Sequence, residues 1–130
     1  MTGSWLGAVM VSIAGTATAA PRDPEEKLAR ALQGRVAGEP VDCIYLREVR
    51  NKRIIDRTAI LYDAGRTIYV NRPRAGQTSL ETSDTLVTRN YSDQLCNIDT
   101  VQLVDSSSQM FSGVVFLGDF VPYTRPKKAD

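Results

Sequence analysis

From Val41 onward, turn residues recur about every eight to twelve positions and divide the chain into short apolar segments. Apolar and polar residues tend to alternate within the segments, which predicts strands rather than helices. Short connections favour antiparallel pairing. The chain is therefore expected to be mainly β: a small antiparallel β-barrel or curved sheet with one short N-terminal helix. The predicted strands are 41–49, 53–62 with an interruption near Asp56 and Arg57, 67–70, 85–88, 98–105, 113–117 and 120–123.

The turns between these strands are predicted from their residue types. Gly65 can adopt a positive φ at little cost, so 63–66 is expected to be a hairpin turn. The serines at 106–108 are expected to connect the strands on either side of them. Segment 71–84 is polar and contains Pro73 and Gly76, so it is predicted to be a long loop. Loops of that length are often functional or mobile.

The predicted helix covers residues 23–33. Asp23 suits the N-cap and Pro24 the first helical position, while Glu26 completes the spacing of a capping box. Gly34 is placed to end the helix. Residues 34–40 then read as a connector, because they contain two glycines and a proline.

Residues 1–19 read as a cleavable signal peptide. They contain no charged side chain, and an apolar run is followed by small residues, with Ala17 and Ala19 where signal peptidase needs them. The basic residue that usually opens such a signal is missing, so an N-terminal membrane anchor or a buried helix remains an alternative. The apolar run is about half as long as a bilayer-spanning helix requires. We expect a periplasmic or secreted protein with no stable membrane span after cleavage.

The predicted organisation is one small domain behind the signal: 1–19 signal peptide, 20–40 short helix and connector, 41–124 disulfide-stapled β domain and 125–130 charged tail. The chain carries 16 basic and 15 acidic residues, for a net charge of +1. That balance argues against a nucleic-acid binder, which needs a clearly basic face.

The two cysteines, Cys43 and Cys96, both lie behind the predicted signal. In an oxidising compartment such a pair indicates a disulfide. Two separate buried thiols are the alternative. A metal site is not expected, because two thiolates without any histidine fall short of a four-ligand zinc shell.

The absence of histidine restricts the possible chemistry most. It excludes Ser-His-Asp and Cys-His nucleophile activation. No glycine-rich phosphate loop is present, and no cofactor is expected. Carboxylate chemistry of the glycosidase type remains open. The candidate carboxylates all lie at strand ends or turns, where Asp ordinarily serves local hydrogen bonding; they are Asp56, Asp63, Asp99 and Asp105.

Two basic segments are candidates for binding. The first consists of Arg47, Arg50, Lys52, Arg53 and Arg57. Its structural interpretation is a solvated face that protects a sheet edge, and its functional interpretation is contact with an anionic envelope component. The second is Asn71, Arg72 and Arg74, where two arginines around a proline could clamp a carboxylate or phosphate. Alternatively, these arginines could pair with Glu81 and Asp84 and merely order the loop.

The mature chain resembles a family of small uncharacterised exported proteins of Gram-negative bacteria over residues 26–123. The resemblance rests on 32–35, 41–44, 53–56, 69–74, 94–96 and 117–123, whose letters are LQGR, VDCI, RIID, YVNRPR, QLC and LGDFVPY. No activity is established for that family, so the resemblance implies export and an intact domain.

Taken together, the sequence predicts a non-enzymatic binding or envelope-associated module whose partner is an unknown envelope component or protein. Its predicted contact residues are Asn71, Arg72 and Arg74. A small carboxylate-dependent glycan hydrolase is the alternative, and an inhibitor of another enzyme is a third possibility.

Overall fold

The structure is a computed structural model that describes residues 23–88 and 92–126. The predicted signal peptide lies outside the described residues. The elements, in chain order, are α1 (Pro24–Ala31), β1 (Val36–Ala37), β2 (Cys43–Tyr45), the 3-10 helix η1 (Leu46–Glu48), β3 (Asn51–Ile55), β4 (Ala59–Asp63), β5 (Thr67–Asn71), the 3-10 helix η2 (Gln77–Ser79), β6 (Asp84–Val87), β7 (Gln94–Cys96), β8 (Thr100–Asp105), β9 (Phe111–Phe116) and β10 (Phe120–Thr124).

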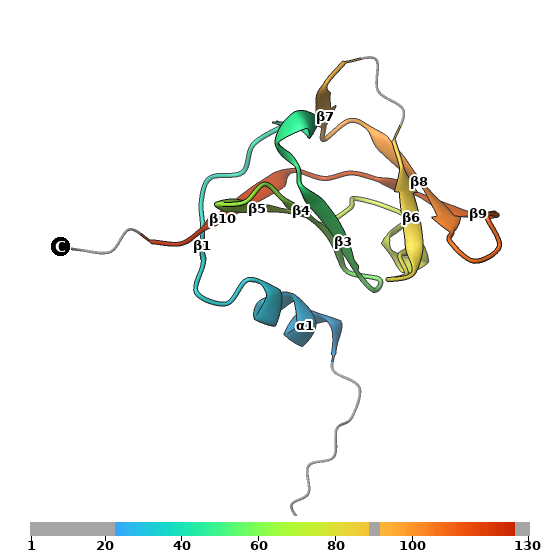
Figure 1. The fold of residues 1–130 in the computed structure, drawn as a ribbon, viewed down its shortest axis with the longest axis horizontal. Coiled ribbons are helices and arrows are strands. Elements are labelled where there is room, and N and C mark those ends of the chain that lie inside the picture. The colour runs from blue at the N-terminus through green and yellow to red at the C-terminus, as the bar shows by residue number, and fades with distance from the viewer. Residues whose placement is uncertain (1–22, 89–91, 127–130) are drawn as a thin grey trace, which may run out of the picture.

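The strands form three antiparallel sheets (Figure 1). The largest has the order β1-β10-β5-β4-β3, the second has the order β6-β8-β9, and β2 pairs with β7 in a third. The prediction of a mainly β fold with one N-terminal helix is confirmed, in the form of curved sheets rather than a closed barrel.

The chain passes from the three-stranded to the five-stranded sheet between β9 and β10. The segment after β5 runs beside the end of β9, because Ala75 forms an isolated antiparallel bridge with Phe116. Gly118 lies at the crossing, and a Cβ built on it would approach the carbonyl oxygen of Arg72 to 2.4 Å. A side chain at this position would therefore clash with backbone.

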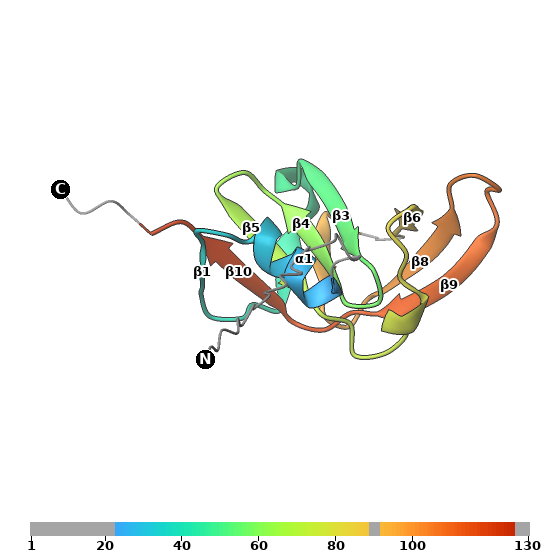
Figure 2. The ribbon, with the colours of Figure 1, turned by 90° about the horizontal axis from the view of Figure 1, so that it is seen from below.

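Two apolar clusters fill the fold, one on each face of the five-stranded sheet. The inner one includes Ile54, Ile60 and Tyr62 and is enclosed by all three sheets. The outer one includes Ile55 and Leu61 and is covered by α1, which lies across this sheet in Figure 2. Because consecutive side chains of a strand point to opposite faces, burial on both faces makes β4 almost continuously apolar.

The helix begins as predicted but is capped differently. Pro24 occupies its first turn, and the backbone carbonyl of Asp23 accepts from the N–H groups of Glu26 and Lys27. The Asp23 side chain makes no capping hydrogen bond, so the predicted side-chain cap is wrong. Gly34, with φ of 81°, follows the helix as expected. The predicted connector contains the short strand β1, which pairs with β10.

The predicted single strand over 53–62 is two strands, β3 and β4, that pair with each other. The sequence hides this hairpin because its turn contains neither Gly nor Pro. Arg57 adopts φ of 53° instead, and Thr58 donates its N–H to the carbonyl of Ile55. Positive φ is uncommon for residues other than glycine, so the residue types predicted an interruption near Asp56 and Arg57 but not a reversal of the chain.

Three further segments differ from their predictions. The expected strand 41–49 is limited to β2, because η1 follows directly. The expected loop 71–84 contains η2, preceded by Gly76 at φ of 84°. A Cβ at Gly76 would approach the carbonyl oxygen of Val114 to 2.2 Å, so this loop is held against β9. Strand β7 was not predicted at all.

The disulfide between Cys43 and Cys96 is present. These residues are register partners in the β2–β7 sheet, with Cα atoms 4.0 Å apart. The bond therefore joins two strands at directly opposed positions, and it closes a separation of 53 residues.

Candidate functional site

A groove separates the two larger sheets where their edge strands face each other. Strand β3 ends the five-stranded sheet and β6 ends the three-stranded one; in the described part of the chain the two form no pair. Figure 1 shows β3 and β6 facing across this seam. The groove has a volume of 440 Å³ and is lined by residues 49–54 and by Thr82, Asp84, Thr85 and Leu86. That volume lies within the range of ligand sites.

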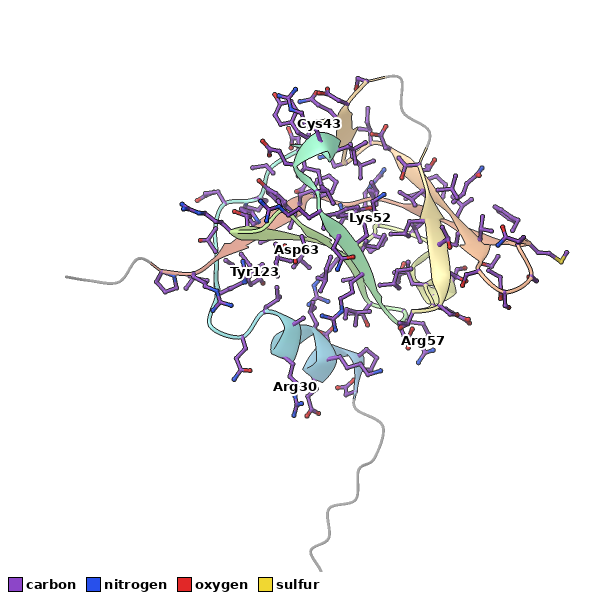
Figure 3. All side chains as sticks on the ribbon, in the orientation of Figure 1. Arg30, Cys43, Lys52, Arg57, Asp63 and Tyr123 are labelled. Carbon is purple, nitrogen blue, oxygen red and sulfur yellow. A yellow bond between two sulfur atoms is a disulfide. The ribbon has the colours of Figure 1, made fainter. Side chains whose placement is uncertain are left out.

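The groove has an apolar floor and a basic rim. Ile54 is buried in the inner cluster, and Val49 and Leu86 pack against that cluster. Lys52 and Arg53 are exposed on β3, and neither forms a salt bridge within residues 23–88 and 92–126. Figure 3 shows Lys52 beside β3 in the region between the two sheets. The Ile54 carbonyl of β3 accepts from the Thr82 hydroxyl at 3.4 Å. The rest of this unpaired strand edge is bordered by two cations that have no salt-bridge partner among the described residues.

One end of the groove is closed by a hydrogen-bonded contact between the two sides. Thr82 donates its backbone N–H and its hydroxyl to the Asp56 carboxylate, each at 2.6 Å. Arg57 N–H donates to the carbonyl of Leu80 at 3.0 Å. The Thr82 hydrogen bonds lower the pKa of Asp56 against a smaller opposing effect of burial. Asp56 therefore serves as an anchor between the β3–β4 turn and the approach to β6.

A second hollow of 680 Å³ adjoins the groove and is surrounded by four arginines. We call it the arginine hollow; its lining residues are Arg35, Arg50, Ala64, Gly65, Arg66 and Arg125. Arg50 lines both the groove and the hollow, so the basic surface is continuous between them. No lining residue is acidic.

Arg35 holds the hollow together. Its guanidinium donates to the carbonyl of Arg66 at 2.8 Å, to that of Tyr123 at 3.3 Å and to that of Gly65 at 3.4 Å. These bonds connect the β4–β5 turn to the end of β10. Gly65 has φ of 92°, and a Cβ there would lie 3.3 Å from the Arg50 guanidinium carbon. The predicted glycine turn thus brings sequence-distant arginines to one place.

The predicted contact residues Asn71, Arg72 and Arg74 are engaged within the protein. Asn71 is fully buried, and its side chain exchanges hydrogen bonds with the backbone of Gly118. Arg72 forms a two-pronged ion pair with Glu25 of α1, at 2.9 and 3.0 Å. Arg74 donates its Nε–H to the carbonyl of Leu117 at 2.8 Å. Their role in binding stays a prediction.

The structure divides the predicted basic cluster of residues 47–57. Arg47 pairs with Asp93 at 3.3 Å, and its guanidinium lies over the ring of Tyr45. Arg57 lies at the tip of the β3–β4 hairpin (Figure 3), and it is not among the residues that line the groove. The remaining three, Arg50, Lys52 and Arg53, line the groove.

The four candidate carboxylates accept hydrogen bonds at the turns where they lie. Asp63 accepts from the N–H of Gly65 at 2.8 Å, and Asp99 from that of Cys96 at 2.7 Å. Asp105 accepts from Ser107 and Ser108, which lowers its pKa and shapes the β8–β9 turn predicted from the serine run. Asp56 anchors Thr82 as described. These contacts match the local role expected of Asp in turns.

One buried polar group stands out in the inner cluster. The Tyr62 hydroxyl has no hydrogen-bond partner among the described residues. Burial raises the pKa of Tyr62 well above its usual value. Its ring packs edge-on against Phe120, with centroids 5.8 Å apart.

Within residues 23–88 and 92–126, no three side chains capable of metal ligation gather into a site. In the same part of the chain, no helix has both the length and the apolar character needed to cross a membrane. Comparison of the chain with family models, curated proteins and solved structures found no match. The proposals below therefore rest on the arginine hollow and, separately, on the groove.

Proposed function

We propose that this chain is an exported, non-enzymatic binding module that recognises an anionic envelope component through the arginine hollow. The observation that carries the proposal is the convergence of Arg35, Arg50, Arg66 and Arg125 around one turn without a carboxylate in the lining. Guanidinium groups bind carboxylate, phosphate and sulfate groups bidentately. Four of them around a shared hollow favour an anionic ligand.

The overall charge of the chain shows why the clustering of these four arginines is informative. Basic and acidic residues nearly balance over the whole chain, with a net charge of +1. A basic hollow in such a protein reflects local placement rather than general basicity. Since like charges repel, a bound anion would offset the repulsion among the arginines.

Export supports the same proposal and has its own test. The uncharged apolar start predicts cleavage after Ala19, and a disulfide is typical of oxidising compartments. Mass spectrometry of the protein from the fractionated native host should give a chain that begins at Ala20 and is absent from the cytoplasm. An intact N-terminus in the cytoplasm would contradict export without bearing on the hollow.

The hollow is tested by comparing two double variants of equal charge. Arg66→Ala/Arg125→Ala removes two exposed arginines of the hollow, whereas Arg30→Ala/Arg57→Ala removes two exposed arginines outside it. Binding is measured to dextran sulfate and to vesicles with and without anionic phospholipid. We expect the first variant alone to lose at least about tenfold in affinity, with weaker binding at high salt.

The two probes separate the sources of the anion. Selective binding to anionic vesicles would indicate a lipid headgroup, while selective binding to the soluble polymer would indicate a glycan-like polyanion. Equal losses in the two double variants would show that general charge rather than the hollow determines binding. No binding to either probe would overturn the proposal.

A further inference from the structure

We propose that the groove between β3 and β6 binds an extended, acidic segment of a partner polypeptide as an added strand on β3. This inference does not depend on the arginine hollow. It starts from the backbone: β3 pairs only with β4, so one side of β3 faces the groove without a strand partner in the described structure. A peptide that pairs with an exposed edge gains main-chain hydrogen bonds whatever its side chains.

The groove also offers side-chain contacts for such a strand. Ile54 lies at its base, beside the partly buried side chains of Val49 and Leu86. Because side chains alternate across a strand, Ile54 faces the inner cluster while Arg53 shares the other face with Ile55. Since Ile54 is already buried, an added strand would cover the partly exposed Val49 and Leu86 and meet a cation at the position next to Ile54.

Charge determines which strand fits. Arg50, Lys52 and Arg53 line the β3 side, and Asp84 is the single acidic residue of the lining. Asp84 accepts a hydrogen bond from the Ser112 hydroxyl at 3.1 Å. Neither Lys52 nor Arg53 has a carboxylate partner within the described residues. Acidic side chains on the partner would supply the missing countercharges.

The same charges disfavour a second copy of this chain. If β3 paired with β3 of another molecule around Lys52 and Arg53, basic side chains would face each other across the pair. Like charges at opposed positions destabilise a sheet, and basic residues on edge strands commonly protect against such association. The basic residues thus disfavour pairing of β3 with β3 of a second molecule, and the edge remains available to an acidic strand.

The required partner pattern follows from the order of residues on β3. The partner should present an apolar residue opposite Ile54 and acidic residues opposite Arg53 and Lys52. A suitable probe is a peptide of about nine residues built from the repeat Val-Glu-Glu, with both ends capped. The matched control is the Val-Lys-Lys peptide of equal length.

The first experiment measures binding of both peptides to the purified, disulfide-bonded protein by fluorescence anisotropy. We expect the Val-Glu-Glu peptide to bind and the Val-Lys-Lys peptide to fail. Lys52→Glu/Arg53→Glu should weaken binding of the acidic peptide at least about tenfold, whereas the charge-matched variant Arg30→Glu/Arg57→Glu should keep it. Neither Arg30 nor Arg57 lines the groove; Figure 3 shows Arg30 on α1 and Arg57 at the tip of the β3–β4 hairpin.

The second experiment distinguishes strand addition from simple charge attraction. Hydrogen exchange of the unaltered protein should show alternate amides of β3 slowed when the acidic peptide is added, and slowed less at high salt. Binding of the peptide without slowed exchange of the β3 amides would overturn the proposal of strand addition. So would equal binding of both peptides, or no binding of the acidic one.

Sedimentation of the free protein tests whether a second copy of the chain occupies the groove. A dimer whose formation protects β3 amides would mean that a second copy occupies the groove, and the proposal would be wrong. The hollow and the groove can fail separately, since Arg66→Ala/Arg125→Ala leaves Lys52 and Arg53 in place.

Discussion

The Asn71 side chain and the Gly118 backbone form a closed pair of hydrogen bonds inside the protein. Asn71 Nδ2–H donates to the Gly118 carbonyl at 2.7 Å, and Gly118 N–H donates to Asn71 Oδ1 at 2.9 Å. An amide side chain thus takes the place of a facing strand residue at the point where the chain crosses between sheets. Both bonds are buried. Losing either one would leave a buried polar group with neither a protein partner nor water to bond to.

We therefore expect Asn71→Asp to destabilise the protein by about 3 kcal/mol, because the carboxylate cannot donate to the Gly118 carbonyl. Asn97→Asp is the matched control: it also replaces an amide donor by a carboxylate, here beside the exposed carboxylates of Asp42 and Asp119. Because solvent screens the added repulsion at this exposed site, it should cost about 1 kcal/mol. Urea unfolding near neutral pH measures both. Equal losses would contradict a structural role specific to Asn71.

The disulfide should contribute a large share of the stability. Closing a separation of 53 residues is worth about 4 kcal/mol in the chain-entropy description. Cys43→Ala/Cys96→Ala should therefore lower the free energy of unfolding by roughly that amount. Intact mass under alkylation checks the bond itself: both thiols should react only after reduction, and labelling without reductant would exclude it.

Removing the Tyr62 hydroxyl should stabilise the protein. Tyr62→Phe keeps the ring contact with Phe120 and eliminates a buried hydroxyl that has no partner in the described structure. We expect a gain of about 1 kcal/mol near neutral pH, measured by urea unfolding.

The same substitution should alter the behaviour in alkali. Burial raises the pKa of Tyr62 in the folded protein, so above about pH 10 the unfolded chain ionises this group while the folded chain does not. Stability is then full below pH 10 and falls as the pH rises further. The wild type should lose more stability than Tyr62→Phe over that window; parallel curves would contradict the assignment.

The ion pair between Glu25 and Arg72 should make a small, pH-dependent contribution. The Arg72 hydrogen bond lowers the pKa of Glu25, so its contribution is present above the usual carboxyl range and lost as the pH falls through the lowered value. Both side chains are more than half exposed, which limits the gain to about 0.5 kcal/mol.

Glu25→Gln should therefore be slightly less stable than the wild type at pH 7 and equal to it near pH 3. Thermal unfolding at the two pH values measures the difference, and added salt should reduce it at pH 7. A difference that persists in acid would point to packing of α1 rather than to charge.

Local signals made much of the fold predictable. The glycine turn at Gly65 and the serine turn after Asp105 were found from residue types that favour turns. Strand β7 was missed because three residues are too few to show a period. The hairpin at Arg57 was missed because a residue other than glycine carries the positive φ.

The candidate site was less predictable because it depends on tertiary placement. Arg35 and Arg125 lie far apart in the described chain. They meet only when β10 pairs with β5 and Arg35 bonds to β10 and to the β4–β5 turn. The groove depends on two strands that do not pair, which no residue pattern records. Sequence reasoning found Arg50, Lys52 and Arg53 but assigned more weight to Asn71, whose burial it could not see.

The position of the disulfide has a consequence for chemical damage to the backbone. The covalent loop from Cys43 to Cys96 contains β3, β4, β5 and β6, and hence both walls of the groove. A single cut by a protease anywhere in that loop would leave two fragments still joined through sulfur. The nicked molecule would keep its parts together until a reductant released them.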